Sequence, residues 1–130
     1  MSALKEKAIA LLGSVAAVNL NAVAFTALYT VPPGKKCLVD HDKIRNLSAT
    51  AGSAVATFGQ SGDKDDFVGA QTLSNLSAAG KAGKIQPIQS ATTPAIVEYA
   101  AGTVFGIDVT TAAGSACTAT IDVFGHLWSV

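Results

Sequence analysis

The chain has 130 residues, with nine basic and nine acidic side chains and no net charge at pH 7. This length suits one domain. Nucleic acid is not an expected partner, because binding to its phosphates needs a cluster of lysines and arginines, and the sequence shows no such cluster. No run reaches the roughly 18 apolar residues of a membrane span. Hydrophobic residues make up 49% of the chain and charged residues 14%, so we expect association with partners through apolar surface rather than through charge.

A short helix is predicted at the amino terminus, where apolar residues recur at spacings of three and four and so share one helical face. These residues are Leu4, Ala8, Leu11, Leu12 and Val15. Residues 1–23 are expected to form an arm, as a short helix or an extended segment, ahead of a domain spanning residues 24–130. A helix of about 12 residues needs something to pack against, so the arm either caps the domain or docks on a neighbour.

The same region has some features of a signal peptide. Lys5 and Lys7 precede the apolar run 8–12. Glu6 lies beside that run and Gly13 follows it, which argues against secretion.

Strand-forming residues dominate from position 24 onward. Residues 24–31 are predicted as a strand that ends at the turn Pro32-Pro33-Gly34. Residues 35–47 are predicted as a second, longer strand. Strict alternation cannot persist through it, so we expect a bulge or kink near His41.

The middle of the chain is the least regular part. Residues 54–59 alternate as a third strand, and residues 60–66 are predicted as a polar loop. Residues 71–84 are rich in Ser, Ala and Gly, with Leu73 and Leu76 as the apolar anchors. This stretch is expected to be a short helix with a flexible loop, or an excursion that reaches a partner.

Four short strands are predicted in the last third. Residues 85–88 are expected at a sheet edge, because Pro87 lacks an N–H donor, and residues 95–99 follow. Residues 103–110 and 116–124 alternate clearly and are predicted to pair as a hairpin.

Seven or eight short strands without long crossover helices favour an all-β fold, an antiparallel β-sandwich or jelly roll. Its core is expected to contain Phe25, Tyr29, Phe58, Phe105 and Ile121.

Two acidic clusters could provide catalytic or metal sites. In Asp40-His41-Asp42, neighbouring strand side chains point to opposite faces, so His41 is expected to face away from both aspartates. The run 63–66 offers three carboxylates, but it lacks the spacing of a calcium loop and contains Lys64. No nucleophile elbow or phosphate-binding loop is present. We therefore expect no catalytic residue, cofactor or metal.

The roles of three further residues, two cysteines and a tryptophan, stay open. Cys37 and Cys117 lie in strand-like runs, and whether they form a disulfide stays open. Trp128, three residues from the carboxyl end, either folds back on the core or fills a pocket in a neighbour.

Three segments together resemble small structural proteins from the virions of tailed bacteriophages. They are Leu28-Tyr29-Thr30-Val31-Pro32-Pro33-Gly34-Lys35, then Ile44-Arg45-Asn46, and the closing Thr120-Ile121-Asp122-Val123-Phe124-Gly125. In those proteins a strand similar to the first segment opens a β-sandwich. The resemblance covers about half of the chain, and similar segments occur in head decoration proteins and in tail or fibre proteins.

The resemblance implies a capsid decoration or cement subunit that is assembled in the bacterial host cytoplasm and located in the virion. Its expected partners are the major capsid protein and further copies of itself, as a trimer. Candidate interface residues are Leu11, Leu12, Val15 and Trp128. The alternative is a phage tail or fibre component, or a carbohydrate-binding β-sandwich module, for which Trp128 is the aromatic candidate.

Overall fold

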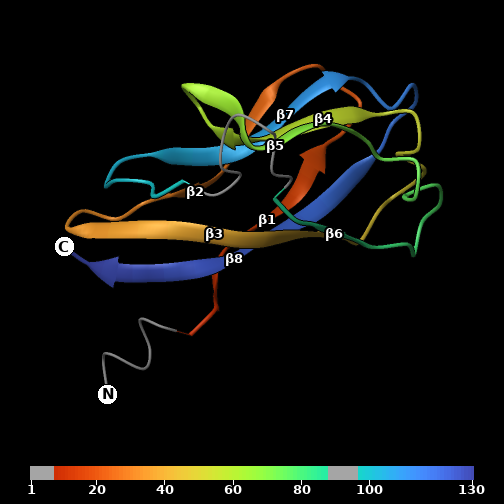
Figure 1. Ribbon diagram of the computed structural model, residues 1–130. Helices are drawn as coiled ribbons and strands as arrows, with labels where there is room; N and C mark the ends of the chain where they lie inside the picture. The colour runs from red at the N-terminus through yellow and green to blue at the C-terminus, as the bar shows by residue number, and fades with distance from the viewer. Residues whose placement is uncertain (1–7, 88–96) are drawn as a thin grey trace.

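The computed structural model describes residues 8–87 and 97–130, and these contain eight strands and no helix. The strands are β1 (Ala10–Asn19), β2 (Phe25–Thr30), β3 (Lys35–Arg45), β4 (Val55–Gln60), β5 (Asp63–Thr72), β6 (Gly83–Ile85), β7 (Val104–Thr111) and β8 (Thr118–Ser129). They form two layered sheets, β1-β8-β3-β6 and β2-β7-β4-β5 (Figure 1). Every neighbouring pair of strands is antiparallel. No helix in the described ranges is long and apolar enough to cross a membrane.

The strand order identifies the type of sandwich. The first strand pairs with the eighth, the second with the seventh, the third with the sixth and the fourth with the fifth. This is the pattern of one long hairpin rolled over on itself, which is the double-sheet jelly roll. The predicted all-β antiparallel sandwich is confirmed, in its jelly-roll form.

Several local predictions are also confirmed. The turn after β2 is closed by a hydrogen bond from the N–H of Lys35 to the carbonyl of Pro32, at 3.3 Å, and Gly34 supplies the positive φ of 72°. In β3 the pairing with β8 shifts between Val39 and His41, which is the expected bulge. Leu73 and Leu76 are buried, as the anchors of the Ser-, Ala- and Gly-rich segment.

The predicted amino-terminal helix is wrong where the structure describes it, and residues 1–7 lie outside the described ranges. Residues 10–19 form β1, which pairs with β8 from Ala10 to Asn19 and buries Val18. Gly13 disfavours a helix, and β8 offers a full ladder of backbone partners. Two register shifts in β1 explain why its apolar residues do not alternate as in a regular strand.

Two other predictions are corrected. The strands predicted as residues 103–110 and 116–124 exist as β7 and β8, but they belong to different sheets and do not form a hairpin. Their connection crosses between the layers. Residues 60–66 are not simply a loop, because the chain turns at Ser61 and Gly62 and enters β5 at Asp63. Charged residues at the start of β5 suit its position at a sheet edge.

The core fills the space between the two sheets. Phe58, Phe105 and Ile121 are fully buried, as predicted. Tyr29 is half-buried against the core. Phe25 is instead on the outward side of its sheet, opposite Asp108, and Lys64 Nζ lies 5.6 Å from its ring centroid.

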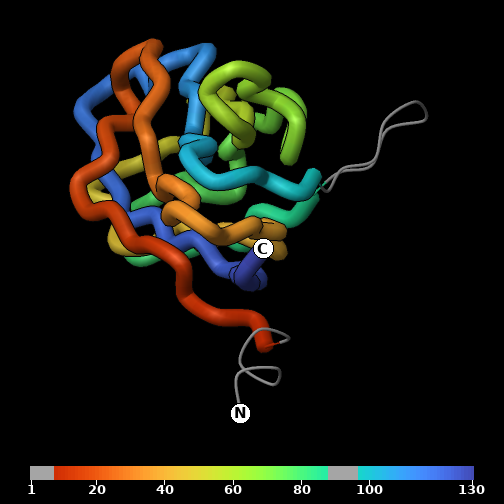
Figure 2. The backbone as a smooth tube through the Cα atoms, turned by 90° about the vertical axis from the view of Figure 1, so that its left-hand side faces the viewer, coloured from red at the N-terminus to blue at the C-terminus, as the bar shows by residue number. Residues whose placement is uncertain are grey.

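One side of the sandwich is closed by β1 and β2, which lie side by side (Figure 2). The approach is close, because a Cβ added at Gly13 would lie 2.9 Å from the carbonyl oxygen of Leu28. The start of β1 extends past the rest of the sandwich, where Ile9 and Leu11 are 51% and 56% exposed. β1 is therefore paired with β8 along its length, with an exposed apolar beginning and a partly buried second half.

Candidate interaction surface

The outward side of the β1-β8-β3-β6 sheet is the surface on which unusual side chains gather, and we call it the outer face. Strand alternation places every second residue of β8 there, and directly opposite partners share a face. On the outer face, five residues of β3 lie directly opposite residues of β8: Lys36 opposite Trp128, Leu38 opposite His126, His41 opposite Phe124, Lys43 opposite Asp122, and Arg45 opposite Thr120. Two adjacent rows of side chains thus run along the sheet.

One part of the outer face is aromatic and apolar, and we call it the aromatic half. It consists of Leu11, Leu38, His41, Phe124, His126 and Trp128. The rings of His41 and Phe124 are stacked, with centroids 4.7 Å apart and planes 10° apart. Apart from the buried His41, these side chains are half-buried or exposed. They supply little to the core, so this surface is suited to contact with another molecule.

The bulge in β3 changes how the acidic neighbours of His41 lie. Asp40 Oδ2 is 2.7 Å from His41 Nδ1, so the expectation that His41 faces away from both aspartates is wrong for Asp40. The extra residue at the bulge breaks the alternation and lets these two side chains meet. Asp42 lies inside the sandwich, fully buried. The three residues therefore do not converge on one point.

The other part of the outer face is polar and is organised by Asp122. Its Oδ2 accepts a hydrogen bond from Arg45 Nε at 2.7 Å, and its Oδ1 accepts one from the Ser14 hydroxyl. Asp122 is only 6% exposed, and the hydrogen bond from Arg45 is the main reason that its pKa lies below the usual range. These contacts connect β1, β8 and β3.

Two lysines on the outer face lack such a partner. Lys43 and Lys84 are directly opposite each other on β3 and β6, and both are exposed. Lys43 Nζ lies 5.3 Å from the centroid of the Phe124 ring, while the neighbouring Asp122 is engaged by Arg45. Among the described residues, no carboxylate is within ion-pair distance of either lysine. We call Lys43 and Lys84 the basic pair.

The four predicted interface residues do not form one patch. Leu11 pairs with Phe124 and Trp128 with Lys36, which places both on the outer face. Leu12 and Val15 pack against the core. The aromatic half itself was not predicted, although the alternation of Phe124, His126 and Trp128 in the sequence is the signal that could have revealed it.

A buried carboxyl group lies behind this sheet. Neither oxygen of Asp42 has a hydrogen-bond partner among the described residues, and burial raises its pKa well above the usual range. Nearby, the Tyr99 hydroxyl donates a hydrogen bond to Asp66 Oδ1 at 2.7 Å, and desolvation by burial is the main cause that raises the pKa of Tyr99. Within the described ranges, no group of three or more His, Cys, Asp or Glu side chains is arranged to hold a metal ion.

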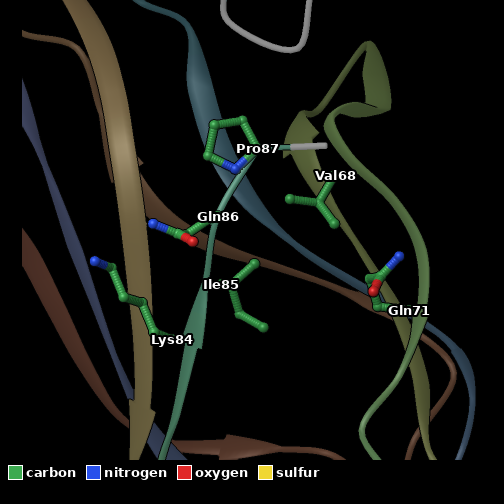
Figure 3. A pocket seen from close by; sticks show the side chains of 6 residues that line it. All are labelled: Val68, Gln71, Lys84, Ile85, Gln86 and Pro87. Atoms are coloured by element: carbon green, nitrogen blue, oxygen red, sulfur yellow. The ribbon is translucent and has the colours of Figure 1, made fainter. Parts of the chain in front are cut away.

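A pocket of about 310 Å³ lies where β5 and β6 face each other at the open side of the sandwich. Its lining residues are Val68, Gln71, Lys84, Ile85, Gln86 and Pro87. Ile85 and Val68 point toward each other across it, and Lys84 points to the other side of β6 (Figure 3). Apart from Lys84, amide and aliphatic groups line the pocket.

The cysteines are separate free thiols. Cys37 and Cys117 are both buried and unpaired within the described residues. Burial raises the pKa of Cys37 to about 11, so the thiolate that reacts with electrophiles is scarce at neutral pH.

Comparisons with known proteins find a similar fold in a solved phage capsid structure. No protein-family model matches the chain, and no curated protein sequence matches it. A chain of the solved cyanophage Pam1 capsid asymmetric unit has a similar structure, with a TM-score of 0.55. The two are 15% identical in sequence, and the match covers 91% of this chain and 84% of that one. The likeness therefore extends over nearly the whole fold, and the two chains are similar in length.

Proposed function

We propose that this protein is a structural subunit of a phage head, of the decoration or cement type, and that its work is not catalytic. The observation that carries the proposal is the fold likeness to a chain of similar length within a capsid asymmetric unit. The jelly roll is a recurrent architecture of viral capsid domains, although a fold alone does not determine function. The virion-like segments around Leu28 and Thr120 support the same role.

The aromatic half is the surface that best suits contact with the capsid protein. Phe124 and Trp128 occupy alternate outward positions on β8, with His126 between them along the same row. Aromatic side chains of this kind contribute strongly to binding when a partner desolvates them. The exposed Leu11 extends the apolar area onto β1. Such a contact would be driven by burial of apolar surface, at about 25 cal/mol per Å².

The test uses empty heads of the phage that encodes this chain, prepared without it. The purified chain is mixed with these heads, and the mixture is separated on a density gradient. The proposal expects the native chain to co-sediment in a saturable manner, and Trp128→Ala together with Phe124→Ala to reduce binding at least about tenfold.

A matched control variant is Phe25→Ala, which removes an outward aromatic ring from the other sheet. It should bind as the native chain does, provided that circular dichroism shows each variant to be folded. A chain that ignores heads but binds isolated tails or a glycan array would overturn the proposal in favour of a tail component or a carbohydrate-binding module.

A further inference from the structure

Among the described residues, two places bring like-charged side chains together without an ion pair of their own. On the outer face, Arg45 is matched by Asp122, and Lys36 by Glu98 at 3.6 Å. The basic pair remains. Like charges directly opposite each other in a sheet are destabilising, so Lys43 and Lys84 repel each other. Asp122 lies opposite Lys43 on β8 and attracts it from beyond ion-pair distance, but this carboxylate is already engaged by Arg45 and Ser14.

The second place is the tip of the β4–β5 hairpin. Asp63 and Asp65 are exposed and form no ion pair with a described residue. Their carboxyl groups crowd each other, since a hydrogen bond with Asp65 is the main cause that raises the pKa of Asp63. Asp66 is engaged separately, by Gln60 Nε2 at 2.8 Å and by the Tyr99 hydroxyl. The tip therefore presents two carboxylates that form no ion pair with a described residue, while Lys64 between them reaches the ring of Phe25.

These two places lie on different surfaces of the sandwich. The tip folds over the outward side of the β2-β7-β4-β5 sheet, where Lys64 reaches the ring of Phe25. The basic pair is on the outward side of the other sheet, at its β6 edge. Figure 1 shows the β4–β5 hairpin and the β3–β8 layer on opposite sides of the molecule. One chain cannot bring its own tip to its own basic pair.

We propose that the carboxylates of Asp63 and Asp65 in one copy dock on Lys43 and Lys84 of the next copy, so that the chain associates head to tail. Two carboxylates of one copy then meet two lysines of the next, and each pair relieves the repulsion between the like charges of the other pair. The zero net charge of the chain leaves no long-range repulsion to oppose the contact. A head-to-tail contact closes into a ring when its rotation allows, and the expected trimer is one such ring.

This inference rests on the proposed role as an assembling subunit, but its test contains no capsids. Sedimentation velocity of the purified chain is measured over a range of concentrations, in about 50 mM and about 500 mM salt. Oligomers are expected at low salt, with weaker association at high salt because exposed charges are screened. Lys84→Glu should weaken association at least about tenfold, because it places like charges in contact.

The matched control is Lys81→Glu, which makes the same change of charge at an exposed lysine outside the strands. It should associate as the native chain does. A charge-swapped chain carrying Lys43→Glu, Lys84→Glu, Asp63→Lys and Asp65→Lys should associate again, since its opposite charges still face each other. All four positions are exposed, so the fold should tolerate the exchanges.

A native chain that stays monomeric at every concentration overturns the inference. So does an equal effect of Lys84→Glu and Lys81→Glu, or a charge-swapped chain that stays dissociated. A monomer that still binds heads would contradict the head-to-tail contact and leave the proposed function standing.

Discussion

Arg45 and Asp122 join β3 to β8 through a hydrogen bond of 2.7 Å between Nε and Oδ2, on the outward side of the sheet. Asp122 also accepts the hydroxyl of Ser14 from β1, so one nearly buried carboxylate connects three strands. Hydrogen bonds to a charged acceptor are stronger than those to a neutral one.

Asp122→Asn should lower the free energy of unfolding by about 1–2 kcal/mol at pH 7, because both hydrogen bonds would lose their charged acceptor. The pKa of Asp122 is lowered in the folded state, so its contribution is present above the unfolded pKa and disappears as the pH falls through the folded one. Urea unfolding at pH 7 and pH 3 measures this. A difference between the native chain and the variant that stays constant with pH would contradict the assignment.

The buried Asp42 predicts the opposite dependence on pH. Its folded pKa is raised, so stability is greatest below the unfolded pKa, near pH 4, and falls as the pH rises toward the folded pKa. Asp42→Asn removes the ionisation and should be more stable than the native chain at pH 7, because its side chain stays neutral at every pH. Urea midpoints between pH 4 and pH 7 provide the measurement, and parallel curves would disprove the prediction.

Gly125 is required where β8 passes β3. A Cβ at this position would lie 2.2 Å from the carbonyl oxygen of Leu38 and 3.0 Å from Cα of Val39, next to the bulge. Gly125→Ala should destabilise the fold by about 1–3 kcal/mol, because the backbone must shift to admit the methyl group. The control is Gly69→Ala in β5, where nothing lies within 4 Å. Thermal unfolding compares the two, and equal melting temperatures would contradict the close approach.

Both thiols should be inert in the folded protein. Cys37 and Cys117 are buried, and the pKa of Cys37 is about 11. A thiol-reactive dye at pH 8 should label neither residue in the native chain and both after denaturation, because burial blocks access to both thiols and the raised pKa of Cys37 makes its thiolate scarce. Rapid labelling of the native chain, or no labelling after denaturation without a reductant, would be inconsistent with two buried free thiols.

The strands of the fold could be predicted where apolar and polar residues alternate along the sequence. β4, β7 and the first part of β8 follow this rule, and the bulge near His41 was visible as a break in it. The amino-terminal strand was not, because the register shifts of β1 give its leucines and valines a spacing close to that of a helix. Which strands pair with each other could not be predicted either, since β7 and β8 are consecutive in the chain but belong to different sheets.

The candidate surface could be predicted only in part. Trp128 was found through its position near the carboxyl end and Leu11 through the spacing of the amino-terminal apolar residues, and both lie on the outer face. Leu12 and Val15 were grouped with them by helical spacing, which does not apply in a strand. The basic pair depends on the register between β3 and β6, strands that are separated by β4 and β5 in the chain. No local pattern encodes such a register.

The central claim is that this chain is attached to phage heads through the outer face of its β1-β8-β3-β6 sheet. Cryo-electron microscopy of heads reconstituted with the purified chain tests it most directly. The account predicts additional jelly-roll density at regular lattice positions, with Phe124 and Trp128 turned toward the capsid protein. Heads without added density, or density whose contact is made by the other sheet, would contradict it.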